Sequence, residues 1–252
     1  MGGRFMRIKA ILSYHGKDFF GYQIQTKTNE RSVQDEIQKV LSRIFSSEIK
    51  IYGSGRTDRG VHALNQCIHF DVERENVDLV KLRYSLNCLL EEDIYIKSLE
   101  VVDESFHARF SVIDKTYLYK INVGEFDVFN RHLVFNLNKE LDLSLIKEAS
   151  KKFIGEHSFH NFCANDEDFI RIINNIEITS DNNIVSIKIN GNGFRRYMVR
   201  MIVGTLIEVG LKHIDLNQID YYLSEVNSRV SYKAPSEGLY LYDINYGGEF
   251  ND

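Results

Sequence analysis

The alternation of apolar and polar residues along the first part of the chain predicts strands separated by two amphipathic helices. Residues 7–14 place four apolar side chains on one strand face: Ile8, Ala10, Leu12 and Tyr14. Apolar residues spaced by three or four predict helices that begin after Ser32 and Asp78, two residue types typical of helix N-caps. Further strands are expected from residue 49 into the following loop, at 66–72 and at 94–102. The predicted order is β-α-β-β-α-β.

The second part of the chain repeats this order. Alternating apolar residues predict strands at 115–123, near 170–180, at 184–190 and at 239–246. Helices are expected around 145–153, at 195–209 and, as a short addition, near 216–226. The predicted order is again β-α-β-β-α-β, with one extra helix before the last strand.

A repeated β-α-β-β-α-β order is typical of the ferredoxin-like fold, in which both helices lie on one face of an antiparallel sheet. We therefore predict an α+β protein made of two ferredoxin-like units, at 1–105 and 106–252, whose mostly antiparallel sheets join side by side. The sheet face opposite the helices would carry a broad groove. The first unit would present a glycine-rich loop at 53–65.

The composition indicates a protein with a substantial core and no membrane segment. Of the 252 residues 43% are hydrophobic, yet no apolar run approaches the roughly 20 residues that span a bilayer. The start of the chain lacks the apolar stretch of a secretory signal peptide. Cys67, Cys88 and Cys163 are odd in number and widely spaced, which argues against a disulfide framework or a Cys-x-x-Cys metal site. We expect a cytoplasmic protein with inert thiols.

The charge distribution bears on the kind of partner. A formal net charge of −5 and a pI near 5.9 argue, taken alone, against nucleic acid. Net charge does not describe local patches, however. Basic residues gather at Arg56 and Arg59 and again at Arg195, Arg196 and Arg200, whereas acidic residues gather elsewhere. A molecule of this composition can be acidic overall and basic in its cleft.

Residues 53–60 carry the most distinctive candidate chemistry. Three glycines in eight residues indicate tight turns or a close approach of the backbone to a ligand. One carboxylate, Asp58, lies between Arg56 and Arg59, whose guanidinium groups would favour its ionised form and could hold a phosphate backbone. An ordinary turn with solvated arginines is the alternative interpretation.

The wider stretch Gly-Arg-Thr-Asp-x-Gly-Val-His-Ala at 55–63 closely resembles the catalytic motif of the tRNA pseudouridine synthase A (TruA) family. In that family the aspartate of the motif is the nucleophile, which implies this role for Asp58. Whether Asp58 attacks the ribose carbon or only assists its deprotonation stays open. The resemblance also implies that Arg56 helps to hold the flipped nucleotide open. Arg59 stands where the family usually has a small residue and is a candidate RNA contact.

A second stretch, residues 106–119, looks like another motif of the family. There the first of two tyrosines contacts the target uracil ring, which implies that Tyr117 stacks on the base. Sheet packing is the alternative for Tyr117, and Tyr119 is expected in the core.

Residues 192–204 resemble a third motif, in which an arginine pairs with the catalytic aspartate. Arg200 is that arginine here, and its position near the apolar side of a predicted helix favours a carboxylate partner such as Asp58. A surface arginine paired elsewhere is the alternative. Matches at 14–23, 32–34 and 234–241 extend the resemblance over nearly the whole chain, and the departures, such as Tyr22 for a common tryptophan, remove no catalytic group.

The resemblance implies a function as well as a fold. The chain would convert uridine to pseudouridine in tRNA, in or near the anticodon stem-loop, where the family acts at positions 38 to 40. The reaction involves no redox step or external group transfer, so no cofactor is expected. The base must leave the stack to be reached, and loop or end-of-stem uridines unstack at least cost. Family members are homodimers that hold tRNA across both subunits, so a homodimer is expected.

Two other classes of function stay open at this point. One is a non-catalytic RNA-binding protein that uses the same sheet face. The other is a hydrolase that uses Asp58 together with His62. For both His62 and His69 the more ordinary interpretation is a structural, hydrogen-bonded histidine. No histidine spacing indicates a metal site, and none is expected.

Overall fold

The computed structural model describes residues 5–25, 30–74, 76–164, 168–224 and 228–248. The chain divides into two compact units. The first unit comprises residues 1–113 together with 241–252, and the second comprises residues 114–240. Each unit combines a mostly antiparallel sheet with α-helices, which confirms the mixed α and β composition expected from the sequence.

The first unit contains the predicted β-α-β-β-α-β order. Its elements are β1 (Met6–Tyr14), α1 (Val33–Phe45), β2 (Ile51–Gly53), β3 (His62–Val72), α2 (Leu79–Leu89) and β4 (Ile94–Val102). The strand order is β4-β1-β3-β10, β10 being Leu239–Asn245, and the short β2 pairs with β3. In the antiparallel registers Ile8 pairs with Phe70 of β3 and with Val101 of β4.

One boundary differs from the prediction and bears on the candidate site. The strand expected to start at residue 66 starts at His62, because Ala63 pairs with Tyr14 across a register shift in β1. The glycine-rich loop is therefore shorter than the predicted 53–65. It covers residues 54–61, between β2 and β3, so Asp58 lies on a short connection between two paired strands.

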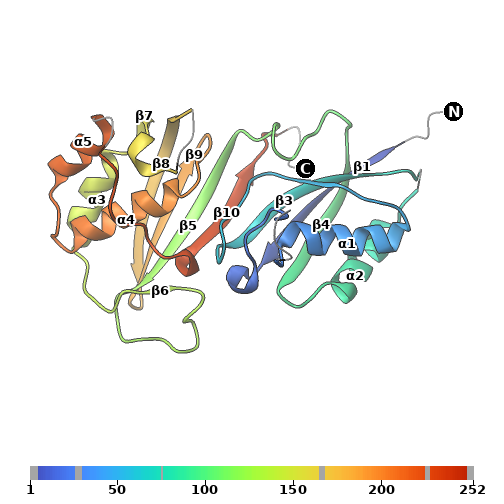
Figure 1. Cartoon of the computed structure of the whole chain (residues 1–252), viewed down its shortest axis with the longest axis horizontal. Helices are drawn as coiled ribbons and strands as arrows, with labels where there is room; N and C mark the ends of the chain where they lie inside the picture. The colour runs from blue at the N-terminus through green and yellow to red at the C-terminus, as the bar shows by residue number, and fades with distance from the viewer. Residues whose placement is uncertain (1–4, 26–29, 75, 165–167, 225–227, 249–252) are drawn as a thin grey trace. The chain divides into compact units, whose positions relative to one another are not determined.

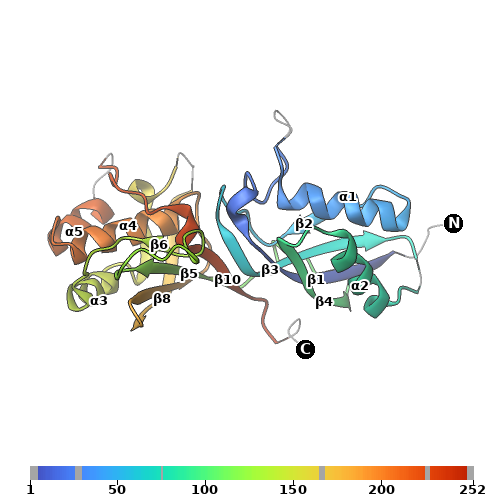
Figure 2. The same cartoon turned by 90° about the horizontal axis from the view of Figure 1, so that it is seen from below.

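The helices of the first unit begin where the predicted caps place them. The Ser32 side chain accepts a hydrogen bond from the Asp35 N–H at 3.3 Å, and the Asp78 carboxylate accepts one from the Lys81 N–H at 3.0 Å. α1 buries the face formed by Val33, Ile37, Leu41 and Phe45. Figures 1 and 2 show α1 lying over one face of the sheet of its own unit.

The second unit adds short elements that apolar periodicity did not predict. Its elements are β5 (Asp114–Asn122), β6 (Phe135–Asn136), α3 (Leu143–Lys151), β7 (Gly155–Ser158), β8 (Ile170–Asp181), β9 (Ile184–Gly191), α4 (Met198–Gly210) and α5 (Leu216–Ser224). The strand order is β5-β9-β8-β7, with β6 parallel to β5. β6 and β7 have two and four residues, too few to show an alternation. The last two residues of the helix expected at 216–226 lie outside the described residues.

α4 starts later than predicted. The residues before it turn, and Tyr197 takes a left-handed backbone conformation with φ of 68° as the N-cap. The helix therefore begins at Met198 instead of 195, and Arg195 and Arg196 precede it. Figures 1 and 2 show α4 on one face of the sheet of the second unit.

The division between the units falls after residue 113 instead of near 105. Residues 106–113 stay with the first unit because their backbone bonds to it. The Ala108 N–H donates to His69 Nδ1 at 3.1 Å, the Tyr246 hydroxyl donates to the Ala108 carbonyl at 2.7 Å, and the Ile113 N–H donates to the Asn245 carbonyl at 2.9 Å. β10 begins in the second unit and continues into the first at Leu241.

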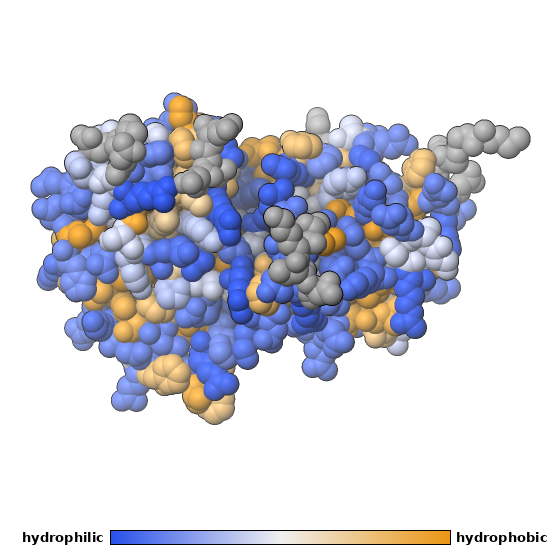
Figure 3. Space-filling model, in the orientation of Figure 1, coloured by the Kyte–Doolittle hydropathy of each residue, from blue (hydrophilic) through white to orange (hydrophobic). Residues whose placement is uncertain are grey.

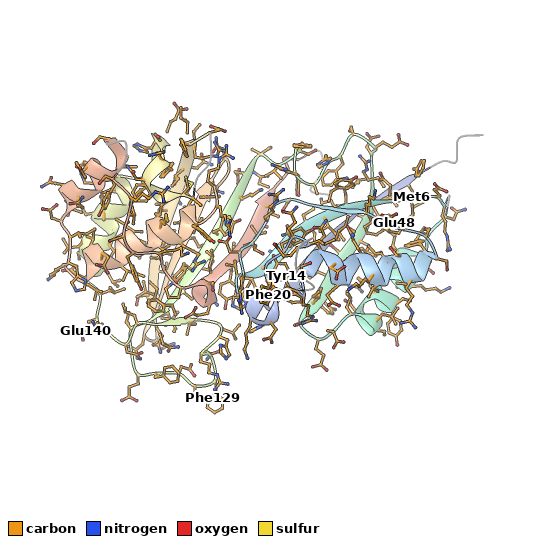
Figure 4. The ribbon with its side chains drawn as sticks, viewed as in Figure 1. Met6, Tyr14, Phe20, Glu48, Phe129 and Glu140 are labelled. Atoms are coloured by element: carbon orange, nitrogen blue, oxygen red, sulfur yellow. The ribbon has the colours of Figure 1, made fainter. Side chains whose placement is uncertain are left out.

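The surface drawn in Figure 3 is largely hydrophilic, with apolar side chains scattered over it. Among the large apolar side chains of the described residues, Phe129 is the most exposed. It lies in the connection between β5 and β6 and is labelled in Figure 4. Within the described ranges, no helix is both long enough and apolar enough to cross a membrane.

Candidate active site

The loop at 54–61 presents one carboxylate between two exposed arginines. Asp58 is half-buried, whereas Arg56 and Arg59 are exposed. The Ser54 N–H donates to the Cys67 carbonyl at 2.8 Å at the start of the loop, and the Val61 N–H donates to the Asp58 carbonyl at 3.1 Å near its end. The loop is thus a constrained turn on the edge of a strand pair, a support that can hold a reactive group in place.

Gly60 in the loop and Gly53 at the end of β2 are each favoured as glycine for a different physical reason. Gly60 has φ of 78°, a left-handed conformation that disfavours other residues. Gly53 has no positive φ, but a Cβ there would clash with the Tyr22 ring and hydroxyl. The tight turn inferred from the sequence occurs at Gly60. The close approach at Gly53 is to the Tyr22 side chain, and the approach to a ligand stays a prediction.

The segment after β1 packs against the loop through backbone contacts. The Gly60 N–H donates to the Phe19 carbonyl at 3.4 Å, and the Tyr22 N–H donates to the Thr57 carbonyl at 3.1 Å. A Cβ at Gly16 would clash with the Val61 carbonyl. This packing gives a structural reason for glycines in the 14–23 segment.

Arg59 lies over an aromatic ring. Its guanidinium carbon is 4.0 Å from the centroid of the Phe20 ring, a cation–π geometry. Figure 4 labels Phe20 and Tyr14, both of which precede α1 in the chain. The contact holds the exposed guanidinium group close to the turn that carries Asp58.

The two histidines of this region have structural hydrogen bonds. His62 is buried, and its Nδ1 accepts a bond from the Gly16 N–H at 3.0 Å. His69 Nδ1 accepts from the Ala108 N–H. Burial, helped by His107 and Arg7, lowers the pKa of His69 to about 4. Both histidines therefore agree with the structural interpretation expected from the sequence.

Tyr117 belongs to β5 in the second unit. It pairs with Ile189 of β9, it is 8% exposed, and its ring meets Phe194 edge-on with centroids 5.1 Å apart. Tyr119 is fully buried, as predicted, and its hydroxyl donates to the Pro235 carbonyl at 2.7 Å.

Arg200 lies in the first turn of α4 in the second unit. Its Nε donates to the Ala234 carbonyl at 2.7 Å, and its guanidinium carbon is 5.7 Å from the centroid of the Tyr197 ring. This bond from the Arg200 side chain to the Ala234 carbonyl connects α4 to the 234–241 segment. Two stretches that resemble family motifs therefore meet here.

The predicted site residues fall into two groups. Arg56, Asp58 and Arg59 share one loop of the first unit, and Tyr117 and Arg200 belong to the second unit. The pairing of Arg200 with Asp58 and the stacking of Tyr117 on uracil stay predictions. In the described part of the chain, no group of three or more His, Cys, Asp or Glu residues has a geometry that could hold a metal ion.

The three cysteines differ in their exposure to solvent. Cys67 and Cys163 are buried, and Cys88 is exposed. Burial raises the pKa of Cys67, which lies in β3, to about 12. Its thiol is therefore protonated at neutral pH, as expected for an inert cysteine.

Comparison with known proteins identifies the family. The sequence model described as tRNA pseudouridine synthase matches residues 10–111 and 149–247 of this chain. A tRNA pseudouridine synthase A of Mycoplasmoides gallisepticum is 42% identical over 93% of this chain and 89% of its own length. The Bacillus subtilis tRNA pseudouridine synthase A is 38% identical over 96% of this chain and 99% of its own length.

The chain belongs to the tRNA pseudouridine synthase A family. It is therefore an isomerase that acts on uridine in tRNA. A chain in the crystal structure of an archaeal box H/ACA sRNP Nop10-Cbf5 complex is distantly similar, with a TM-score of 0.36, 14% identity, and coverage of 79% of this chain and 43% of that one. The matched ranges include all five predicted site residues except Tyr117, which falls between them.

Proposed function

We propose that this enzyme isomerises uridine to pseudouridine in the anticodon stem-loop of tRNA, at positions 38 to 40, with Asp58 as the nucleophile and without a cofactor. One observation carries the proposal: a half-buried carboxylate stands between two exposed arginines on a turn anchored to paired strands. That arrangement offers a reactive group beside cations suited to a phosphate backbone.

The chemistry balances without any external reagent. The bond between N1 of uracil and C1′ of ribose breaks, the base turns, and a bond forms between C5 and C1′. C5 loses a proton and N1 gains one, so the product is an isomer of the substrate. Asp58 either attacks C1′ or assists deprotonation of the ribose, and both routes need an ionised carboxylate held at the sugar.

The remaining site residues act on the nucleotide and on Asp58. Arg56 helps to hold the flipped nucleotide open, and Arg59 contacts RNA phosphate from its place over Phe20. Tyr117 stacks on the uracil, with its ring plane fixed by the edge-on contact with Phe194. Arg200, held by the Ala234 carbonyl, orients Asp58.

The two units are proposed to be ferredoxin-like domains that bind tRNA. The strand orders support this assignment. In the first unit β1 lies between β4 and β3, and β2 pairs with β3, so strands of the first β-α-β half alternate with strands of the second. In the second unit the order β5-β9-β8 shows the same alternation. We further propose that the enzyme is a homodimer that holds one tRNA across both subunits, in the cytoplasm where tRNA is modified.

Incubation of the purified enzyme with unmodified tRNA tests the function. Pseudouridine mapped at positions 38 to 40, with no release of free uracil, is the expected result. Release of free base would support a hydrolase that uses Asp58 and His62 instead. Tight tRNA binding without any change to uridine would support a non-catalytic RNA-binding protein.

A further inference from the structure

Three buried polar side chains lie in or next to the turn that carries Asp58. Tyr14 comes from the end of β1, Thr57 directly precedes Asp58, and Gln66 comes from β3. They are 5%, 7% and 0% exposed, respectively. All three belong to the first unit, and their polar groups bond to the loop instead of to solvent.

Thr57 is fixed through both its side chain and its backbone. Its hydroxyl bonds to the Tyr14 hydroxyl at 2.8 Å, and its carbonyl accepts the Tyr22 N–H at 3.1 Å. Gly21, with φ of 101°, brings its own backbone so close that a Cβ there would lie 2.7 Å from the Thr57 carbonyl. A shift of Thr57, and with it of Asp58, would break these contacts.

Gln66 fixes the beginning of the same loop. Its Oε1 accepts the Ser54 hydroxyl at 2.6 Å and the Cys67 N–H at 3.2 Å, while its Nε2 donates to the Gly55 carbonyl at 3.0 Å. One side chain therefore bonds to two consecutive loop residues.

Tyr14 keeps its proton under ordinary conditions. Burial raises its pKa to about 12, although the bonds to Thr57 and Gln66 work in the opposite direction. A protonated, buried hydroxyl that is bonded to Thr57 is suited to hold the loop and not to exchange protons with a substrate.

We propose that Tyr14 is a positioning residue that acts through Thr57 to hold Asp58 in its reactive place, and that Gln66 does the same for the start of the loop. This inference rests on the proposed nucleophilic role of Asp58. A misplacement of a reacting group by about 1 Å can lower a rate about 100-fold, so a hydrogen bond next to the nucleophile can govern turnover without contacting RNA.

Tyr14→Phe and Thr57→Val test the hydrogen bond, because each removes one hydroxyl and keeps the shape of the side chain. The measurements are the single-turnover rate of pseudouridine formation, the Kd for tRNA and the Tm. We expect each variant to lose about 10- to 100-fold in rate, with an unchanged Kd and a Tm within a few degrees of wild type. Thr57→Ser, which keeps the hydroxyl, should restore most of the rate.

Two features separate positioning from general support of the fold. The double variant Tyr14→Phe/Thr57→Val should be no slower than the slower single variant, because both changes remove the same bond. Tyr22→Phe is the matched control: its buried hydroxyl has no hydrogen-bond partner among the described residues, so its rate should equal that of wild type.

A wild-type rate for Tyr14→Phe or for Thr57→Val would overturn the inference. Multiplied losses in the double variant, or a Thr57→Ser enzyme as slow as Thr57→Val, would also overturn it. Failure of the proposed function looks different, since the wild-type enzyme would then form no pseudouridine, or Asp58→Asn would remain active.

Discussion

Tyr117 is the residue at which packing and catalysis overlap most. Its ring is nearly buried and touches Phe194, as a core side chain would, yet its place in the sequence implies stacking on uracil. The two roles respond differently to substitution. Loss of a core ring costs roughly 3 to 5 kcal/mol, whereas loss of a stacking surface affects mainly the reaction.

We predict that Tyr117→Leu melts within a few degrees of wild type and loses most of its activity, because leucine keeps the apolar bulk but not the flat π-face. Tyr117→Phe keeps that face and is the matched control, which reports whether the hydroxyl takes part in proton transfer. Thermal melts and single-turnover assays decide the matter. A Tyr117→Leu protein that is badly destabilised but fully active at low temperature would move Tyr117 into the core.

His69 gives the stability a pH dependence. Its pKa is about 4 in the folded protein, against an ordinary value of 6.5, chiefly because burial disfavours the charged ring. The unfolded chain therefore binds more protons between these values. The stabilising contribution is fully present above pH 6.5 and is lost as the pH falls toward 4.

We expect the free energy of unfolding, measured by urea denaturation, to fall from pH 7 to pH 4. Protonation of His69 in the unfolded chain accounts for up to about one proton in the slope of that free energy against pH. His69→Asn should make that fall shallower. An unchanged slope in this variant would show that other groups, such as His107 and Asp71, carry the dependence.

At the scale of residues, a local motif points to candidate catalytic residues but not to the side chains that hold them in position. Arg56, Asp58 and Arg59 are close in sequence, so one motif of nine positions contains all three. The bond between Tyr14 and Thr57 joins residues 43 positions apart. Tyr14 pairs with Ala63 of β3, and Thr57 lies in the loop that leads into this strand, so only the tertiary structure shows that the two hydroxyls meet.

At the scale of elements, the connection between β2 and β3 determines how Asp58 is presented. Gly60 completes the turn in a left-handed conformation, where a side chain costs roughly 1 to 2 kcal/mol. Its N–H also faces the Phe19 carbonyl. The turn therefore depends on this glycine for its backbone geometry.

We predict that Gly60→Ala lowers the Tm by several degrees and lowers the rate of pseudouridine formation, because relief of the strain displaces the turn. Gly248→Ala is the control: Gly248 has no positive φ, and a Cβ there would meet nothing within 4 Å. Differential scanning fluorimetry with rate measurements would show the effect. Equal behaviour of the two variants would contradict the turn's role.

Element order was predictable because the long strands and helices each bury one face. α1 shows this with its Ser32 cap and its buried positions at Val33, Ile37 and Leu41. The limits of elements were less predictable. β3 extends back to His62 through pairing with β1, and residues 106–113 join the first unit through contacts with His69 and Tyr246. Such partners are distant in sequence, so local patterns carry no sign of them.

At the scale of the whole molecule, the net charge of −5 and the proposed RNA surface make opposite electrostatic contributions. If exposed arginines such as Arg56 and Arg59 contact phosphates, counterion release makes binding depend steeply on salt despite the acidic pI. Local charge then governs affinity.

We predict that the affinity for tRNA falls steeply as the salt concentration rises, and that Arg59→Ala weakens binding and reduces the slope by about one phosphate contact. Arg83→Ala is the control, since Arg83 is exposed on α2 and donates to the Lys97 carbonyl at 2.8 Å. Filter binding over a series of salt concentrations measures both slopes. A salt-independent affinity would count against the basic surface.

The most direct test of the account is the single-turnover rate of Asp58→Asn on unmodified tRNA, because the amide keeps the shape of the side chain and removes the nucleophile. Asp78→Asn, which retains a residue able to cap α2, serves as the control. We predict that Asp58→Asn folds and binds tRNA like wild type while its rate falls by several orders of magnitude. Near-normal pseudouridine formation by purified Asp58→Asn would contradict the account.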